Sequence, residues 1–188
     1  MPPVRRLAAL TLAALAVAGC GRERLAVPDV ERPVLTRATV PQAFPDEGVA
    51  FAAPGSWSVS RGDAPLLAQT SSGTATIAVW RYERTEPLPS GDRQLDAAQE
   101  ALLGAVRQRD NTYREISTER IEVDGAPAIE LVGEQRVAGR VRRVRSTHVY
   151  AHGAELVVDQ SSEPSDFARL DAAIFRPLVR SLRVDPPR

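Results

Sequence analysis

Residues 116–137, with the sequence ISTERIEVDGAPAIELVGEQRV, contain the pattern that decides the fold of this chain. Asp124 and Gly125 separate a strand-like stretch at residues 116–123 from a second one at residues 126–137. An Asp-Gly pair between two such stretches is typical of a tight β-hairpin, because both residues tolerate the positive φ that the turn needs. The stretch therefore predicts two antiparallel strands joined at Asp124-Gly125.

The chain after this hairpin continues with strand patterns and ends in a helical one. A turn near Gly139 leads into predicted strands at residues 140–151 and 155–161. Pro177 is expected to break or restart the final helix near Ile174, because proline removes a backbone donor. The helix itself is predicted from an apolar stripe at helical spacing, formed by Phe167, Leu170, Ile174, Leu178 and Leu182.

The chain before the hairpin contains a helix preceded by four short strands. Ser90 or Asp92 can cap the helix, and its apolar positions are Leu95, Ala98, Leu102 and Val106. Strands, helix, strands and helix in this order predict an α+β domain, with one largely antiparallel sheet and helices packed on it. Residues 49–184 suffice for a single such domain. The four strands are predicted at residues 49–53, 57–60, 66–70 and 74–82.

The first nineteen residues have the pattern of a signal peptide. Arg5 and Arg6 precede an uncharged, mostly apolar run at residues 7–18, which is shorter than the roughly 20 residues that span a bilayer. The sequence LAVAGC at residues 15–20 resembles the lipobox of bacterial lipoproteins. That resemblance implies cleavage between Gly19 and Cys20, and a diacylglycerol on the Cys20 thiol. The alternative is an ordinary signal peptide with an incidental cysteine.

Composition narrows the remaining possibilities. Cys20 is the only cysteine, which excludes an internal disulfide. Cleavage would remove two of the 24 basic residues and no acid, leaving 22 against 24 and a formal charge of −2, so a nucleic-acid partner is not expected. Residues 21–48 contain four prolines without apolar periodicity, so residues 20–48 are predicted to be the lipidated cysteine and a flexible tether, and residues 185–188 a short tail.

Several short motifs lie along residues 49–184: Val49-Ala50-Phe51, Pro54, Trp57, the strand end with Trp80 and Tyr82, the turn at residues 123–128, and Ser181-Leu182 in the closing segment. Together they resemble the PsbP-like group, which includes DcrB-like and mycobacterial LpqN-type lipoproteins. The resemblance covers nearly all of residues 49–184. It implies an α/β/α sandwich around an antiparallel sheet, and an accessory or binding role without catalytic residues.

Four arginines around Val141 and Val144 form the densest charge in the chain. On a strand, Arg143 and Arg145 point to one face, and Arg140 and Arg142 to the other. Either pair is a candidate contact for an anionic headgroup, a cell-wall polymer or an acidic partner. The favoured alternative is a solvated edge strand whose charges discourage pairing. Carboxylates that could neutralise these charges are Asp124, Glu130 and Glu134.

Trp80 and Tyr82 alternate with Ile77 and Val79 on one predicted strand, so both faces of that strand are apolar. We expect a helix layer to cover the Trp80 and Tyr82 face, as aromatic residues in a small domain usually anchor the core. In the alternative, the two residues line a pocket for a ligand.

The two histidines, His148 and His152, have the spacing that lets a helix present both to one zinc ion. On a strand the same spacing separates the side chains by about 13 Å. We therefore expect a surface histidine, a turn histidine and no metal site. The sequence also lacks the motifs of serine hydrolases, nucleotide-binding proteins and zinc peptidases, so no catalytic residue is predicted.

These features together predict a lipid-anchored protein on the extracytoplasmic face of the cell membrane. It would act as a non-enzymatic accessory or interaction module, without a cofactor, and its partner would be an envelope protein, a cell-wall polymer or a lipid. A small-ligand or lipid-binding lipoprotein is the alternative, and a hydrolase is the weaker one.

Overall fold

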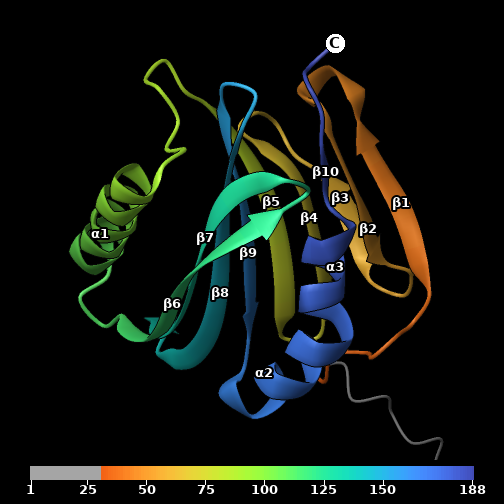
Figure 1. The fold of residues 1–188 in the computed structure, drawn as a ribbon. Coiled ribbons are helices and arrows are strands. Elements are labelled where there is room, and N and C mark those ends of the chain that lie inside the picture. Colours follow the sequence, from red (N-terminus) through yellow and green to blue (C-terminus); the bar gives the residue numbers. More distant parts are fainter. Residues whose placement is uncertain (1–30) are drawn as a thin grey trace, which may run out of the picture.

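The computed structural model describes residues 31–188 and arranges them as two antiparallel sheets with helices on both faces of the larger one (Figure 1). The larger sheet has seven strands in the order β3-β4-β5-β9-β8-β7-β6. The predicted α+β class, with a largely antiparallel sheet, is confirmed. The strands are β3 (Ser58–Arg61), β4 (Leu66–Ser72), β5 (Ala75–Glu83), β6 (Arg114–Val123), β7 (Ala126–Val137), β8 (Arg140–Ala151) and β9 (Ala154–Ser162).

Tight turns join the four strands from β6 to β9. The hairpin at Asp124-Gly125 forms as predicted, with φ of 52° and 78° at the two residues. Two further turns, β7–β8 at Ala138-Gly139 and β8–β9 at His152-Gly153, also have a positive φ at both positions. Such turns match the twist of the strands they connect, which holds these strands in one register.

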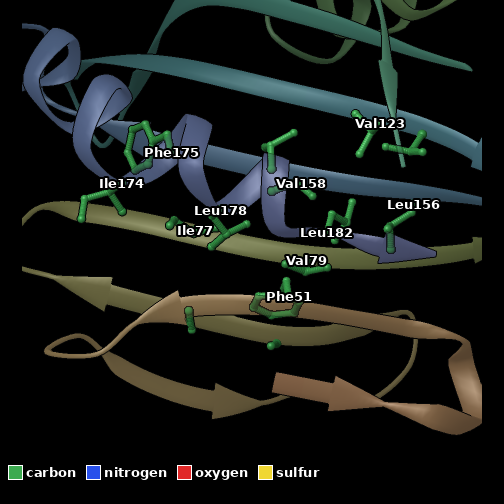
Figure 2. Packing of buried hydrophobic residues seen from close by; sticks show 14 of the residues in the cluster. Phe51, Ile77, Val79, Val123, Leu156, Val158, Ile174, Phe175, Leu178 and Leu182 are labelled. Atoms are coloured by element: carbon green, nitrogen blue, oxygen red, sulfur yellow. The ribbon is translucent and has the colours of Figure 1, made fainter. Parts of the chain in front are cut away.

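One face of the large sheet carries the larger of two hydrophobic clusters, and we call it the core face. The C-terminal helical segment lies on this face, and Figure 2 shows Phe175, Leu178 and Leu182 packed against Ile77 and Val79 of β5. Phe175 also meets Trp57 and Phe167 edge to face, with ring centroids 6.5 and 5.8 Å away. The helical segment comprises α2 (Pro164–Leu170), a π turn η2 (Asp171–Phe175) and α3 (Arg176–Ser181).

The π turn explains how the helix accommodates Pro177. The backbone N–H of Arg176 donates to the carbonyl of Asp171, five residues earlier, so the helix widens just before the proline. The helical segment therefore continues without a break through the π turn. Regular α-helical geometry resumes at Arg176, where α3 begins, and not at Ile174. The apolar stripe predicted from the sequence still faces the sheet.

The predicted tether at residues 21–48 is wrong over its last part. Strand β1 (Thr39–Phe44) pairs with β2 (Val49–Pro54), and β10 (Arg183–Val184) pairs with the other edge of β2. A short 3-10 turn, η1 (Pro45–Glu47), connects β1 to β2. The prediction failed because β1 is mostly exposed and lacks the apolar alternation that marks a half-buried strand.

The segment at residues 31–38 also lies against the domain. The backbone N–H of Val34 donates to Ser72 Oγ, and Trp57 Nε1 donates to the Val34 carbonyl. The predicted signal peptide, with Gly19, and Cys20 lie outside the described residues. Within residues 31–188, no helix has both the length and the apolar character needed to cross a bilayer.

Candidate functional site

Helix α1 (Asp92–Arg109) stands away from the sheet on the face opposite the core (Figure 1). Within this helix Leu95 alone is buried, and it packs with Ile129, Leu131 and Tyr150 of the sheet in a small apolar cluster. A cavity of about 390 Å³ lies between α1 and the sheet. A second hollow of about 380 Å³ runs toward the loop before α1, and Arg84, Leu102, Ala105 and Glu155 line both spaces.

The wall and floor of the cavity differ in chemistry. On the α1 wall, Leu102, Ala105 and Val106 present apolar groups. The floor is formed by alternate residues of β5, β8 and β9, because these positions share one face of the sheet. Its polar members include Ser146, His148, Glu155 and Asp159, while Arg84 and Arg109 supply the positive charge of the lining.

Four floor residues form a continuous hydrogen-bonded chain. Ser146 Oγ lies 2.5 Å from Asp159 Oδ1 and 3.0 Å from His148 Nε2, and His148 Nδ1 lies 2.7 Å from Glu155 Oε1. The β8–β9 register produces this chain, since Ser146 stands opposite Asp159 and Tyr150 opposite Glu155. Arg84 forms an ion pair with the other oxygen of Glu155. The chain therefore ends in two carboxylates, one of which is neutralised by an arginine.

The surroundings of this hydrogen-bonded chain shift the pKa values of two of its members, His148 and Asp159. Burial, with the nearby charges of Arg109 and Arg84, lowers the pKa of His148 from 6.5 to about 4, so the imidazole is neutral at neutral pH. Asp159 is exposed to the cavity, and desolvation by the surrounding protein raises the pKa of its carboxyl group.

Ser146 Oγ–H donates to Asp159 Oδ1, and the two ring nitrogens of His148 contact Ser146 Oγ and Glu155 Oε1. His148 therefore links the Ser146–Asp159 pair to Glu155.

The expected surface position of His148 is wrong. Its side chain is only 12% exposed, because β8 presents it to the space beneath α1. His152 occupies a turn as predicted, with φ of 47°. Across residues 31–188 no group of three or more His, Cys, Asp or Glu side chains is placed to hold a metal ion.

The four clustered arginines are divided among separate environments, and the expected edge strand is wrong because β8 lies between β7 and β9. Arg145 is 3% exposed and is held by Asp171 on the core face, through contacts of 2.8 and 3.0 Å, and by Glu130. Arg143 pairs with Glu134 at 2.6 Å. These two carboxylates, Glu130 and Glu134, neutralise arginines as expected.

The other two arginines, Arg140 and Arg142, point to the α1 face, as their alternation predicts. Arg142 donates to the Thr74 carbonyl and to Ser161 Oγ, while Arg140 is exposed and lies 3.7 Å from Glu163. Asp124, the third carboxylate named from the sequence, lies 3.5 Å from Arg183 instead. Arg145 is thus a structural ion-pair residue, and the remaining three border the end of the sheet.

Trp80 and Tyr82 lie on the α1 face of β5 and stack with ring centroids 6.4 Å apart. Tyr82 is 39% exposed and lines the larger cavity. Helix α1 packs over Ile129, Leu131 and Tyr150 on this face but leaves Tyr82 partly exposed. The stacked rings therefore form an aromatic margin beside the polar floor.

The sequence analysis missed the polar floor. Glu155 and Asp159 are charged residues within an otherwise largely buried strand, β9, and that pattern was the available signal. Their convergence with Ser146 and His148 depends on the β8–β9 register, which the sequence alone did not show.

Comparison with known proteins shows the fold but no family. No family model and no curated protein matches the sequence. The cyanobacterial PsbP protein CyanoP from Synechocystis sp. PCC 6803 is 14% identical, with a TM-score of 0.62 over 79% of this chain and 94% of its own. LpqN of Mycobacterium tuberculosis, described as involved in cell envelope biogenesis, is 14% identical, with a TM-score of 0.57 over 79% and 91%.

A third similar structure is the Ran-binding protein Mog1p of Saccharomyces cerevisiae, which is 6% identical, with a TM-score of 0.56 over 79% of this chain and 96% of its own. The PsbP-like fold implied by the sequence motifs is confirmed. At these identities the likeness concerns the fold alone, so function must be argued from the site.

Proposed function

We propose that this chain is a lipid-anchored, non-enzymatic accessory protein of the bacterial cell envelope, and that its domain binds a small ligand beneath α1. The observation that carries the binding role is the cavity of about 390 Å³ between α1 and the polar residues of the sheet face beneath it. A volume of this size is in the range of small-molecule sites, which combine apolar walls with a few placed polar groups.

The lining indicates the kind of ligand. Asp159, Ser146 and the rim arginines offer hydrogen-bond and charge contacts, whereas Leu102, Ala105 and Val106 offer an apolar surface. A ligand with a polar end and an apolar body would satisfy both. The fold shared with LpqN, a protein involved in cell envelope biogenesis, supports an envelope setting by analogy.

The cavity is tested by filling it. Ala105 lines both spaces, so Ala105→Trp would occupy volume that a ligand needs. Protein purified from its own membranes is examined by native mass spectrometry for bound small molecules. Ala97→Trp is the matched control, because Ala97 lies exposed on the same helix and lines neither space. A bound species retained equally in both variants, or absent from the parent protein, would refute the binding role.

The anchor is tested separately at Cys20. Cys20→Ala should abolish incorporation of a radiolabelled fatty acid and release the domain from the membrane fraction. If this variant still took up label and remained membrane-bound, the lipobox interpretation would be wrong.

A hydrolase is a second candidate, because Ser146, His148 and Glu155 follow the order of a nucleophile, a base and an orienting acid. Two features favour binding instead. Ser146 also contacts Asp159, and its strand is paired on both sides, so the neighbouring backbone N–H groups are committed to the sheet and cannot form an oxyanion hole. Labelling of Ser146 by a fluorophosphonate, lost in Ser146→Ala, would support the hydrolase.

A further inference from the structure

One end of the domain gathers several segments that are far apart in sequence. Hydrogen bonds from Thr74 to Glu31 and from Val34 to Ser72 place residues 31–34 against the β4–β5 turn. Arg142 donates to Thr74, and Arg136 N–H donates to Thr112 Oγ1, which brings the β7–β8 hairpin and the α1–β6 loop to the same end. Helix α2 also lies there, whereas the C-terminus lies at the opposite end (Figure 1). We call this end the tether end, because the N-terminal segment joins the domain here.

The tether end is basic although the domain as a whole is slightly acidic. It carries ten arginines and six carboxylates, a formal charge of +4, whereas the rest of residues 31–188 carries ten arginines and sixteen carboxylates, a charge of −6. The carboxylates are Glu31, Asp110, Glu115, Glu134, Glu163 and Asp166. The arginines are Arg32, Arg37, Arg107, Arg109, Arg114, Arg136, Arg140, Arg142, Arg143 and Arg169.

Several of these arginines are exposed and lack a carboxylate partner. Arg37, Arg114 and Arg136 form no ion pair with another residue of the described part of the chain. Apolar side chains are exposed at the same end. Of the eight large apolar side chains that are exposed within residues 31–188, five lie on its segments: Val34, Leu35, Ile116, Val137 and Val141.

We propose that the tether end is a docking face for an anionic phospholipid membrane. This inference rests on the proposed lipid anchor, because Glu31 follows Cys20 by only eleven positions, a distance of at most about 40 Å. The anchor keeps the domain near the headgroups, and the basic end experiences their negative potential. The exposed apolar side chains can then enter the interfacial region, while the acidic remainder of the domain is repelled from it. The domain therefore stands on this end, with the β8–β9 turn at the opposite end (Figure 1).

The orientation is measurable on the lipidated full-length mature protein. Its only native cysteine, Cys20, is blocked by lipid, so a single added cysteine can carry a fluorophore. Ala138→Cys labels the β7–β8 turn at the tether end, and His152→Cys labels the β8–β9 turn at the other end of β8. Both positions have positive φ in equivalent turns. The protein is reconstituted into phosphatidylcholine vesicles with or without phosphatidylglycerol, and energy transfer to a headgroup acceptor is recorded.

The expected result is stronger transfer from position 138 than from position 152, only with phosphatidylglycerol, and a loss of this difference when salt shortens the Debye length to about 3 Å. The triple variant Arg37→Gln, Arg114→Gln and Arg136→Gln should lower the ratio of docked to undocked protein about tenfold or more. The matched triple variant Arg93→Gln, Arg180→Gln and Arg188→Gln removes the same charge elsewhere and should retain docking.

Equal transfer from positions 138 and 152, or transfer independent of phosphatidylglycerol, would overturn the docking face. Transfer that instead depends on the number of protein copies per vesicle would assign this end to a second copy and also overturn it. Intact mass measured beforehand shows whether Cys20 is acylated, and the native mass spectrometry above tests the cavity. Failures of the anchor, the cavity and the docking face are therefore distinguishable.

Discussion

The two faces of the seven-stranded sheet use the same strands for opposite purposes. On the core face, Ile77, Val79 and Val158 pack against α2, η2 and α3 and are buried. On the α1 face, the alternate positions of β8 and β9 carry Ser146, His148, Glu155 and Asp159 beneath a helix that contacts them little. The core face therefore carries the larger part of the buried apolar packing, whereas the α1 face combines a smaller apolar cluster with a polar floor that can form a binding site.

The largest effect is expected from opening a void on the core face. Phe175→Ala should lower the free energy of unfolding by about 4 kcal/mol, because the ring is fully buried and its removal leaves a cavity. Leu102→Ala on the α1 face should cost less than about 1 kcal/mol, because that side chain already borders open space. Urea unfolding of both variants measures the difference. Equal losses would contradict the division of roles between the faces.

The second largest loss of stability is expected from replacing Arg145, the buried arginine on the core face. Arg145→Gln should cost about 3 kcal/mol, because it leaves Glu130 and Asp171 without a buried partner. Arg143→Gln, two residues along the same face, should cost less than about 1 kcal/mol, since the Arg143 and Glu134 pair is partly exposed. The same unfolding measurement applies, and a tolerated Arg145→Gln would show that the ion pair does not hold α2 and η2 to the sheet.

The α1 face should make stability depend on pH. The folded pKa of His148 is about 4 against an ordinary 6.5, so between these values the unfolded chain binds a proton that the folded domain does not. Stability from this residue is therefore fully present above pH 6.5 and is lost as the pH falls toward 4. Its contribution should fall by about 2 kcal/mol between pH 7 and pH 5. In His148→Gln the free energy of unfolding, measured by urea unfolding at several pH values, should lose this part of its pH dependence. The same pH dependence in the variant and the parent protein would contradict a lowered pKa of His148.

The smallest change in stability is expected at the aromatic margin of the cavity. Tyr82→Ala should alter the free energy of unfolding by less than about 0.5 kcal/mol, because the ring is partly exposed and packs mainly on Trp80. Its effect should instead appear as lower ligand occupancy in native mass spectra. A strongly destabilised Tyr82→Ala domain would place this residue with the core rather than with the binding site.

The ends of most helices and strands could be predicted from the sequence because they depend on local patterns. The Asp124-Gly125 turn, the long alternating strands and the α1 periodicity are each set within a few residues. Strand β1 lacks such a pattern and gains its structure from pairing with β2. The π turn before Pro177 likewise depends on the sheet against which the helical segment packs.

The candidate site was less predictable because it depends on contacts between residues that are far apart in the sequence. Tyr82 could be proposed as a pocket residue from strand alternation alone, but the polar floor requires Ser146, His148, Glu155 and Asp159 to meet across two strands. The clustered arginines of β8 show most clearly what the sequence could not predict. Arg145 forms a buried ion pair with Asp171, whereas Arg140 on the same strand is exposed near Glu163.

By itself the sequence determined the order of the strands and helices from β2 to α3 and the α+β class, because periodicity and turn residues act over short distances. The anchor at Cys20 stays a prediction from a targeting motif. Only the tertiary structure decided which charges are buried, that His148 faces a cavity, and that basic and apolar residues from distant segments share the tether end. These features depend on strand register and on how far α1 stands from the sheet, which arise from contacts between residues far apart in the chain.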